Sequence, residues 1–140
     1  MATTTRFHEM EAEDIVAAGL RFANGAAGSL VASTASFPGG AESITLHYDR
    51  ASLHLQAGEL HVHWRDGRHE VQGAAGGTGG GADPMAFTHD WHRAVIEDFA
   101  AALTENRPPA ITGTDALAVH DLIDALIRSA REGQFTKVQP

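Results

Sequence analysis

The stretch HRAVIEDFAAALTENRPPAITGTDALAVHDLIDALIRSAREGQFTKV, residues 92–138, is the most informative about the fold. Its apolar residues recur every three or four positions on both sides of the break Asn106-Arg107-Pro108-Pro109, which predicts two amphipathic helices. The first helix is expected to begin near Thr88, an N-cap residue type. The second is expected to open at Thr112-x-x-Asp115, which resembles a capping box, and to end before Gly133.

The sequence before these helices is rich in short runs typical of β-strands. Asn24-Gly25 separates the first two long runs and predicts a hairpin with a type I′ turn. Tight connections at Asp49-Arg50, Ala57-Gly58 and Asp66-Gly67 predict a second meander. The predicted strands are residues 14–22, 26–36, 44–48, 51–55, 59–65 and 69–72, with further strands at residues 1–8 and 135–139.

Alternation along the second meander divides its side chains between two faces. Leu46, Leu53 and Val62 belong to the apolar face, and histidines lie on the opposite one. The first helix carries an apolar stripe centred on Phe99, so we expect Phe99 to pack on the apolar sheet face. Loss of such a buried phenylalanine would cost about 3 to 5 kcal/mol.

Length and composition limit the class of protein. A chain of 140 residues with 43% hydrophobic residues is expected to form a single domain over residues 1–140. It has no cysteine, no signal sequence at its start and no apolar run of the ~20 residues that span a bilayer, so a cytoplasmic protein without a membrane partner is expected. A net charge of −8, with basic residues scattered along the chain, argues against nucleic acid as a partner.

Residues 73–83, GAAGGTGGGAD, are expected to form a flexible glycine-rich loop between the strands and the helices. Gly77-x-Gly79-x-x-Ala82 matches the dinucleotide fingerprint formally. That fingerprint needs a buried strand before it and a helix directly after it, whereas here the preceding strand is short and polar and Pro84 intervenes. We therefore interpret the match as a chance product of glycine repeats, and it predicts no cofactor site.

Histidine is the one residue type in marked excess, with nine copies. His61-x-His63 places two imidazoles on one strand face, and pairing across Asp49-Arg50 would place His54 opposite Thr45 and His47 opposite Ser52 on that face. A zinc or nickel site at His47, His54, His61 and His63 is geometrically possible. The preferred interpretation is no metal, because no acidic residue or cysteine sits at ligand spacing beside the pair. The histidines would then be solvent-facing or part of a subunit interface.

His89 and His92, at the start of the first helix, form a second group. They either face a bound substrate or belong to an exposed first turn, and we take them as the candidate substrate-binding residues. The serines lack a nucleophile-elbow motif, and the paired carboxylates lie on helices whose solvated faces explain them. No catalytic residue is assigned.

Three stretches carry a resemblance to a known family: residues 13–39, EDIVAAGLRFANGAAGSLVASTASFPG; residues 44–62, ITLHYDRASLHLQAGELHV; and the helical tail at residues 92–138. In order and spacing they resemble the C-terminal half of the Gfo/Idh/MocA family of NAD(P)-dependent oxidoreductases, which includes glucose-fructose oxidoreductase and inositol dehydrogenase. The resemblance implies an α+β fold, with an open, mainly antiparallel sheet, two C-terminal helices packed on one face, and a homo-oligomer formed through a sheet face.

The complete enzymes of that family carry an N-terminal Rossmann domain, a Glu-Lys-Pro motif with a catalytic lysine, and an Asp-x-x-x-His motif. This sequence contains none of these, and its single lysine is Lys137. The resemblance therefore implies a substrate-binding and oligomerisation domain, inactive and without a cofactor by itself. The parent enzyme would use NAD or NADP to oxidise a sugar, cyclitol or similar hydroxyl-bearing substrate. The alternative is a stand-alone interaction or metal-binding module that uses the histidine face.

Overall fold

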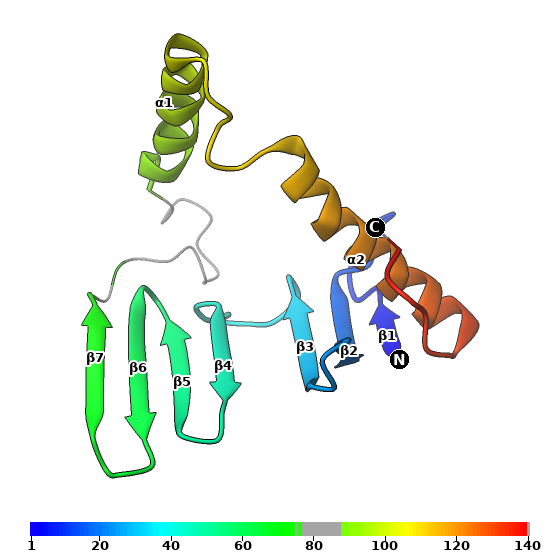
Figure 1. The fold of residues 1–140 in the computed structure, drawn as a ribbon. Coiled ribbons are helices and arrows are strands. Elements are labelled where there is room, and N and C mark those ends of the chain that lie inside the picture. Colours follow the sequence, from blue (N-terminus) through cyan, green and yellow to red (C-terminus); the bar gives the residue numbers. More distant parts are fainter. Residues whose placement is uncertain (75, 77–87, 140) are drawn as a thin grey trace. The chain divides into compact units, whose positions relative to one another are not determined.

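A computed structural model describes residues 1–74, 76 and 88–139 of the chain, and most of the expected glycine-rich loop at 73–83 lies outside these residues. The chain divides into two compact units, one formed by residues 1–36 and 92–140 and the other by residues 37–91. Within the described residues, seven strands precede two helices, all strand pairs are antiparallel, and both sheets are open (Figure 1). The α+β class is therefore confirmed, with the strands divided between two sheets.

The first unit contains a three-stranded sheet with a helix across one face (Figure 1). Its strands are β1 (Ala2–Thr5), β2 (Ile15–Arg21) and β3 (Ala27–Ser33), in the spatial order β1-β2-β3. Helix α2 (Gly113–Glu132) packs against β1. The small side chains of Ala2, Ala18 and Ala125 are buried, and the backbone N–H of Ala2 donates to Ser129 Oγ over 3.0 Å. Small residues thus allow the helix to approach the sheet closely.

Helix α2 begins and ends as predicted. The backbone N–H of Asp115 donates to Thr112 Oγ1, the Thr112 N–H donates to Asp115 Oδ2, and these bonds complete a capping box. Hydrogen bonds from Thr112 lower the pKa of the Asp115 carboxyl. Gly133 closes the helix in the left-handed conformation, with φ of 64°.

Asp14 holds the connection between β1 and β2. It is buried, with 4% of its surface exposed, and its carboxylate accepts 2.8 Å hydrogen bonds from the backbone N–H groups of Phe7 and His8. His8 Nδ1 lies 2.8 Å from the same carboxylate. The bonds from Phe7 and then His8 lower the pKa of Asp14, against the opposing effect of burial. This stabilisation is therefore present above the ordinary carboxyl pKa and is lost as the pH falls through the lowered value.

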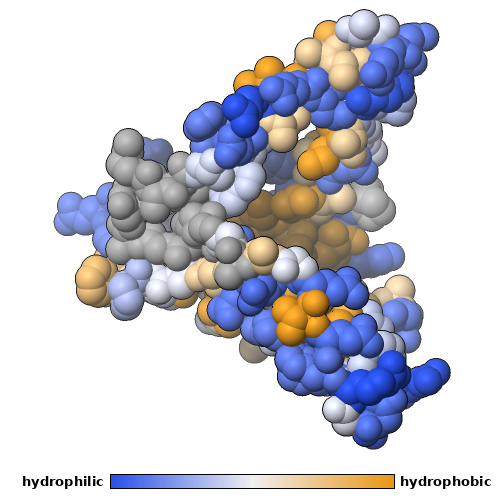
Figure 2. Space-filling view, turned by 90° about the vertical axis from the view of Figure 1, so that its left-hand side faces the viewer, coloured by the Kyte–Doolittle hydropathy of each residue, from blue (hydrophilic) through white to orange (hydrophobic). Residues whose placement is uncertain are grey.

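The second unit contains a four-stranded meander in which each strand pairs with its neighbours in sequence. Its strands are β4 (Ser43–His47), β5 (Ala51–Gln56), β6 (Glu59–Trp64) and β7 (His69–Gly73). Val62 and Ala51 are buried, while Ile44 and Leu46 on the same apolar face are 57% and 43% exposed. Apolar side chains at the molecular surface are orange in the space-filling view (Figure 2).

Two local predictions were wrong. The hairpin at Asn24-Gly25 exists, but only Gly25 has a positive φ, so the turn is not type I′. The Phe22 N–H donates to Ala26 O and the Gly25 N–H donates to Phe22 O, which makes a three-residue loop that places glycine at its left-handed position. Residues 135–139, predicted as a strand, form no strand.

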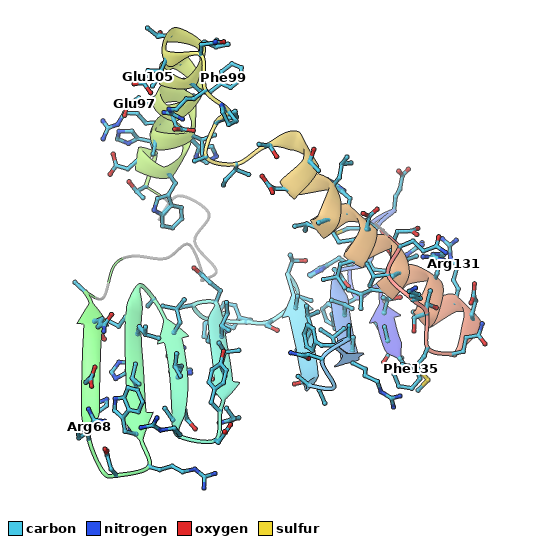
Figure 3. The ribbon with its side chains drawn as sticks, viewed as in Figure 1. Arg68, Glu97, Phe99, Glu105, Arg131 and Phe135 are labelled. Atoms are coloured by element: carbon cyan, nitrogen blue, oxygen red, sulfur yellow. The ribbon has the colours of Figure 1, made fainter. Side chains whose placement is uncertain are left out.

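Helix α1 (Asp90–Glu105) also differs from expectation. The predicted anchor Phe99 is 55% exposed (Figure 3), and Val95 and Leu103 on the same stripe are 62% and 70% exposed. Phe99 is thus not buried within its own unit, and its expected packing on the sheet face that carries Leu46, Leu53 and Val62 stays a prediction. Periodicity identifies the apolar side of a helix, but it does not identify the surface that covers that side.

The connection after α1 is held by Asp98. Its carboxylate accepts hydrogen bonds from the backbone N–H of Ala110 over 2.7 Å and from the Arg107 guanidinium over 2.9 Å. These two bonds lower the pKa of Asp98, that from Ala110 having the larger effect.

Neither α1 nor α2, the helices within the described residues, is long and apolar enough to cross a membrane.

Candidate functional site

The polar face of the β4–β7 sheet carries five of the nine histidines of the sequence, and imidazole is a common metal ligand. Strand register aligns them in two rows, because directly opposed residues in an antiparallel sheet share a face. The predicted pairings of His54 with Thr45 and of His47 with Ser52 are confirmed. One row across the four strands contains Thr45, His54, His61 and Val71. The other contains His47, Ser52, His63 and His69.

Three of these histidines come together at the β6–β7 hairpin. One ligand nitrogen from each of His61, His63 and His69 lies within 4.8 Å of the others. His61 Nδ1 is 3.3 Å from His69 Nε2, and the His63 and His69 rings stack with centroids 4.2 Å apart. His61 is half-buried, whereas His63 and His69 are exposed. This His61–His63–His69 cluster is the candidate metal site.

The structure thus brings together two of the four histidines predicted from the sequence and adds a third. His47 and His54 lie outside the cluster and bond to hydroxyl groups on neighbouring strands. His54 Nδ1 is 2.9 Å from Thr45 Oγ1, and His47 Nδ1 is 2.9 Å from Ser52 Oγ. His69 was missed because its place depends on the register across Asp66-Gly67, which sets His69 directly opposite His63.

An acidic residue does sit beside the cluster, contrary to the expectation that none lies at ligand spacing. Glu59 Oε2 is 3.5 Å from His61 Nε2. The spacing was readable from the sequence, since residues two apart on a strand point to the same face. A carboxylate is therefore available beside the His61–His63–His69 cluster.

The candidate substrate-binding histidines lie at the start of α1. His89 directly precedes the helix, its side chain is 83% exposed, and its Nε2 is 3.6 Å from Asp90 Oδ1. His92 lies in the exposed first turn. Their role in substrate binding stays a prediction.

The first unit contains an open pocket of about 930 Å³ between β1, β2, α2 and the segment after α2. Its lining is mostly apolar, with Phe22, Leu126 and Phe135 among the larger side chains. The Arg21 guanidinium lies 6.0 Å from the centroid of the Phe135 ring, which is labelled in Figure 3. The hydroxyl of Ser129 at this pocket already bonds to Ala2 N and Gln134 O. The pocket therefore offers few polar groups to a hydroxyl-rich ligand.

Solved structures of oxidoreductases share this fold. An oxidoreductase from Agrobacterium radiobacter, in complex with NAD⁺, L-tartaric acid and magnesium, is 22% identical, with a TM-score of 0.71 over 95% of this chain and 41% of that one. An oxidoreductase domain protein from Kribbella flavida is 14% identical, with a TM-score of 0.74 over 99% of this chain and 44% of that one. The chain thus spans less than half the length of these two proteins.

No curated protein matches the sequence. A family does match: residues 1–139 fit the C-terminal alpha/beta domain of an oxidoreductase family. The two β-sheets and the two C-terminal helices are therefore those of a family domain, and the chain belongs to the Gfo/Idh/MocA family of oxidoreductases, as its C-terminal domain.

Proposed function

We propose that this chain is the substrate-binding and oligomerisation domain of an NAD(P)-dependent oxidoreductase. The observation that carries the proposal is that the C-terminal family domain accounts for residues 1–139. The solved oxidoreductases with this fold are more than twice as long as the matched region, since only 41% and 44% of their chains are covered. The remaining part of such an enzyme would supply the cofactor site.

The parent reaction in this proposal is reversible hydride transfer between a nicotinamide and a sugar, cyclitol or related hydroxyl-bearing substrate. The Agrobacterium radiobacter protein supports both the nicotinamide cofactor and the hydroxyl-bearing substrate of this proposal, since it holds NAD⁺ together with L-tartaric acid, a hydroxyl-bearing acid. Within this chain, His89 and His92 are the residues that would face the substrate. The enzyme would act in the cytoplasm, in keeping with the absence of cysteine from the sequence.

The test of this function is a hybrid enzyme. The chain replaces the matched domain of the Kribbella flavida protein, and NADH formation is followed with glucose, myo-inositol and L-tartrate. The hybrid should turn over at least one of these, while the 140-residue chain alone should show none, because it lacks a dinucleotide site. His92→Ala should raise KM in the hybrid, and His120→Ala, on the exposed side of α2, is the control. Turnover by the chain alone, or a folded NAD⁺-binding hybrid inactive on all three substrates, would contradict the proposal.

Self-association is proposed to use a sheet face instead of the helices. In the first unit, α2 covers the face that carries buried Ala18, and alternation places Ala17, Gly19 and Val31 on the opposite face. Val31 is 76% exposed. Small residues around an exposed valine make this face flat enough to meet a second copy.

Light scattering at high micromolar concentration should therefore report a dimer or larger species. Val31→Arg places a charge on the sheet face and should yield a monomer. Val119→Arg makes the same change at a residue of α2 that is 58% exposed and should leave the assembly intact. A monomeric wild-type chain, or dissociation by the α2 variant alone, would disprove the sheet-face assignment.

A further inference from the structure

We propose that His61, His63 and His69 bind a zinc ion on the polar face of the β4–β7 sheet. This site goes beyond the proposed oxidoreductase function, since it involves neither the nicotinamide nor His89 and His92. Neutral imidazole nitrogens are preferred ligands of zinc, nickel and copper, whereas magnesium prefers oxygen. A set of three imidazoles thus selects a transition metal, and zinc is the one that we commit to.

The distances within the His61–His63–His69 cluster suit zinc. Two nitrogens that each bind a tetrahedral zinc at ~2.05 Å lie about 3.3 Å apart. His61 Nδ1 and His69 Nε2 are already 3.3 Å apart. The third donor, a ring nitrogen of His63, lies within 4.8 Å of the donor nitrogens of the other two histidines. Two of the three donors therefore need little change in separation to share an ion.

The rings must still rotate to direct their lone pairs to one point. They are nearly parallel, with interplanar angles of 12° between His61 and His63, 16° between His61 and His69, and 7° between His63 and His69. Because His63 and His69 are exposed, rotation about their side-chain bonds displaces no packed core. Three protein nitrogens leave a fourth coordination position open to water.

Glu59 completes the arrangement as a positioning residue. Its Oε2 lies 3.5 Å from His61 Nε2, while His61 Nδ1 faces the other histidines. If the carboxylate closes this distance on metal binding and accepts the Nε2–H, it fixes the tautomer in which Nδ1 carries the free lone pair, and it raises the basicity of that nitrogen. The contact therefore points the correct His61 nitrogen at the metal.

The backbone holds the donors in place and keeps a neighbouring cation away. His63 pairs directly with His69, and His61 lies two residues earlier on β6, so all three sit on paired strands instead of a loop. Arg68, labelled in Figure 3, lies 4.8 Å over the ring of Trp64. Trp64 follows His63 in the strand, so its side chain lies on the sheet face opposite the histidines. The Arg68 guanidinium therefore stacks on that opposite face, away from the cluster.

Calorimetric titration of the full chain with zinc chloride, on protein prepared without a histidine tag, tests the site. We expect saturable binding of one zinc per chain. His69→Ala removes one ligand and should weaken binding by more than about tenfold, and Glu59→Gln should weaken it by about tenfold. His63→Gln, which keeps a polar side chain at an exposed position, is the second ligand variant if His69→Ala does not fold.

The matched controls are His47→Ala and His54→Ala. Both remove a histidine from the same face outside the cluster, and both should leave the zinc affinity within about twofold, with circular dichroism reporting the fold of every variant. The proposal is overturned if the wild-type chain shows no saturable zinc binding. It is equally overturned if folded ligand variants keep wild-type affinity, or if the controls weaken binding as much as His69→Ala does.

Discussion

Replacing Ala125 with aspartate is expected to detach α2 from the β1–β3 sheet and to unfold the first unit. Ala125 is 4% exposed and lies one helical turn from Ser129, whose hydroxyl binds the backbone of β1. An unpaired carboxylate at this contact costs more than about 4 kcal/mol, close to the whole ~5 to 15 kcal/mol that stabilises a domain. Urea unfolding followed by circular dichroism measures the loss.

Ala118→Asp is the matched control for this prediction. It makes the same change in charge and helix propensity in α2, but at an exposed residue. Its free energy of unfolding should stay within about 1 kcal/mol of that of the wild-type chain, the cost of the lower helix propensity of aspartate. If the two variants unfold at the same urea concentration, Ala125 is not part of the contact between helix and sheet.

Gly73→Ala is expected to disrupt the end of the β6–β7 pairing. Gly73 has a φ of 89°, a conformation that side chains with a Cβ rarely adopt, at a cost of about 1 to 2 kcal/mol. A Cβ there would also come closer than 3.0 Å to the backbone carbonyl of Gly58, so one strand end must move. Such overpacking adds about 1 to 3 kcal/mol, and the combined loss should be visible in urea unfolding.

Gly67→Ala separates the two contributions. Gly67 has a φ of 91°, nearly that of Gly73, but nothing lies within 4 Å of the position where its Cβ would be. This variant should lose only the conformational part, about 1 to 2 kcal/mol. Equal destabilisation by the two substitutions would show that the close approach of Gly73 to Gly58 has no energetic effect.

The register of the second meander could be predicted from the sequence because its connections are short. A two-residue turn at Asp49-Arg50 allows one pairing that keeps Leu46 and Leu53 on the same face, and the structure has that pairing. The same reasoning fails at Asp66-Gly67, where a two-residue turn would have paired His69 with Trp64. The structure has a three-residue loop there, because the Trp64 N–H donates to Arg68 O, and this loop sets His69 opposite His63. The carboxylate of Glu59 followed from alternation alone. His61, His63 and Glu59 were thus readable from the sequence, whereas the place of His69 depends on the length of the β6–β7 loop and the ring orientations depend on side-chain contacts.

Other features could not be obtained from local patterns. The residue types Asn24-Gly25 favour a two-residue type I′ turn. The structure has a three-residue loop instead, closed by the hydrogen bond from the Phe22 N–H to Ala26 O. The stripe centred on Phe99 has helical spacing and yet is exposed. In both cases the local signal is correct about the kind of element, and the outcome depends on backbone bonding or on packing that the local sequence does not encode.

The order in which the two units can form during synthesis on the ribosome follows from their connectivity. The second unit, residues 37–91, is continuous in sequence, and each of its strands pairs with the strand before it, so its contacts have short sequence separation. The first unit is closed by the bond between Ala2 and Ser129, which are 127 positions apart. Chains emerge at about 5 to 20 residues per second, so the meander is complete seconds before α2 leaves the ribosome, and only then can the contact between β1 and α2 form.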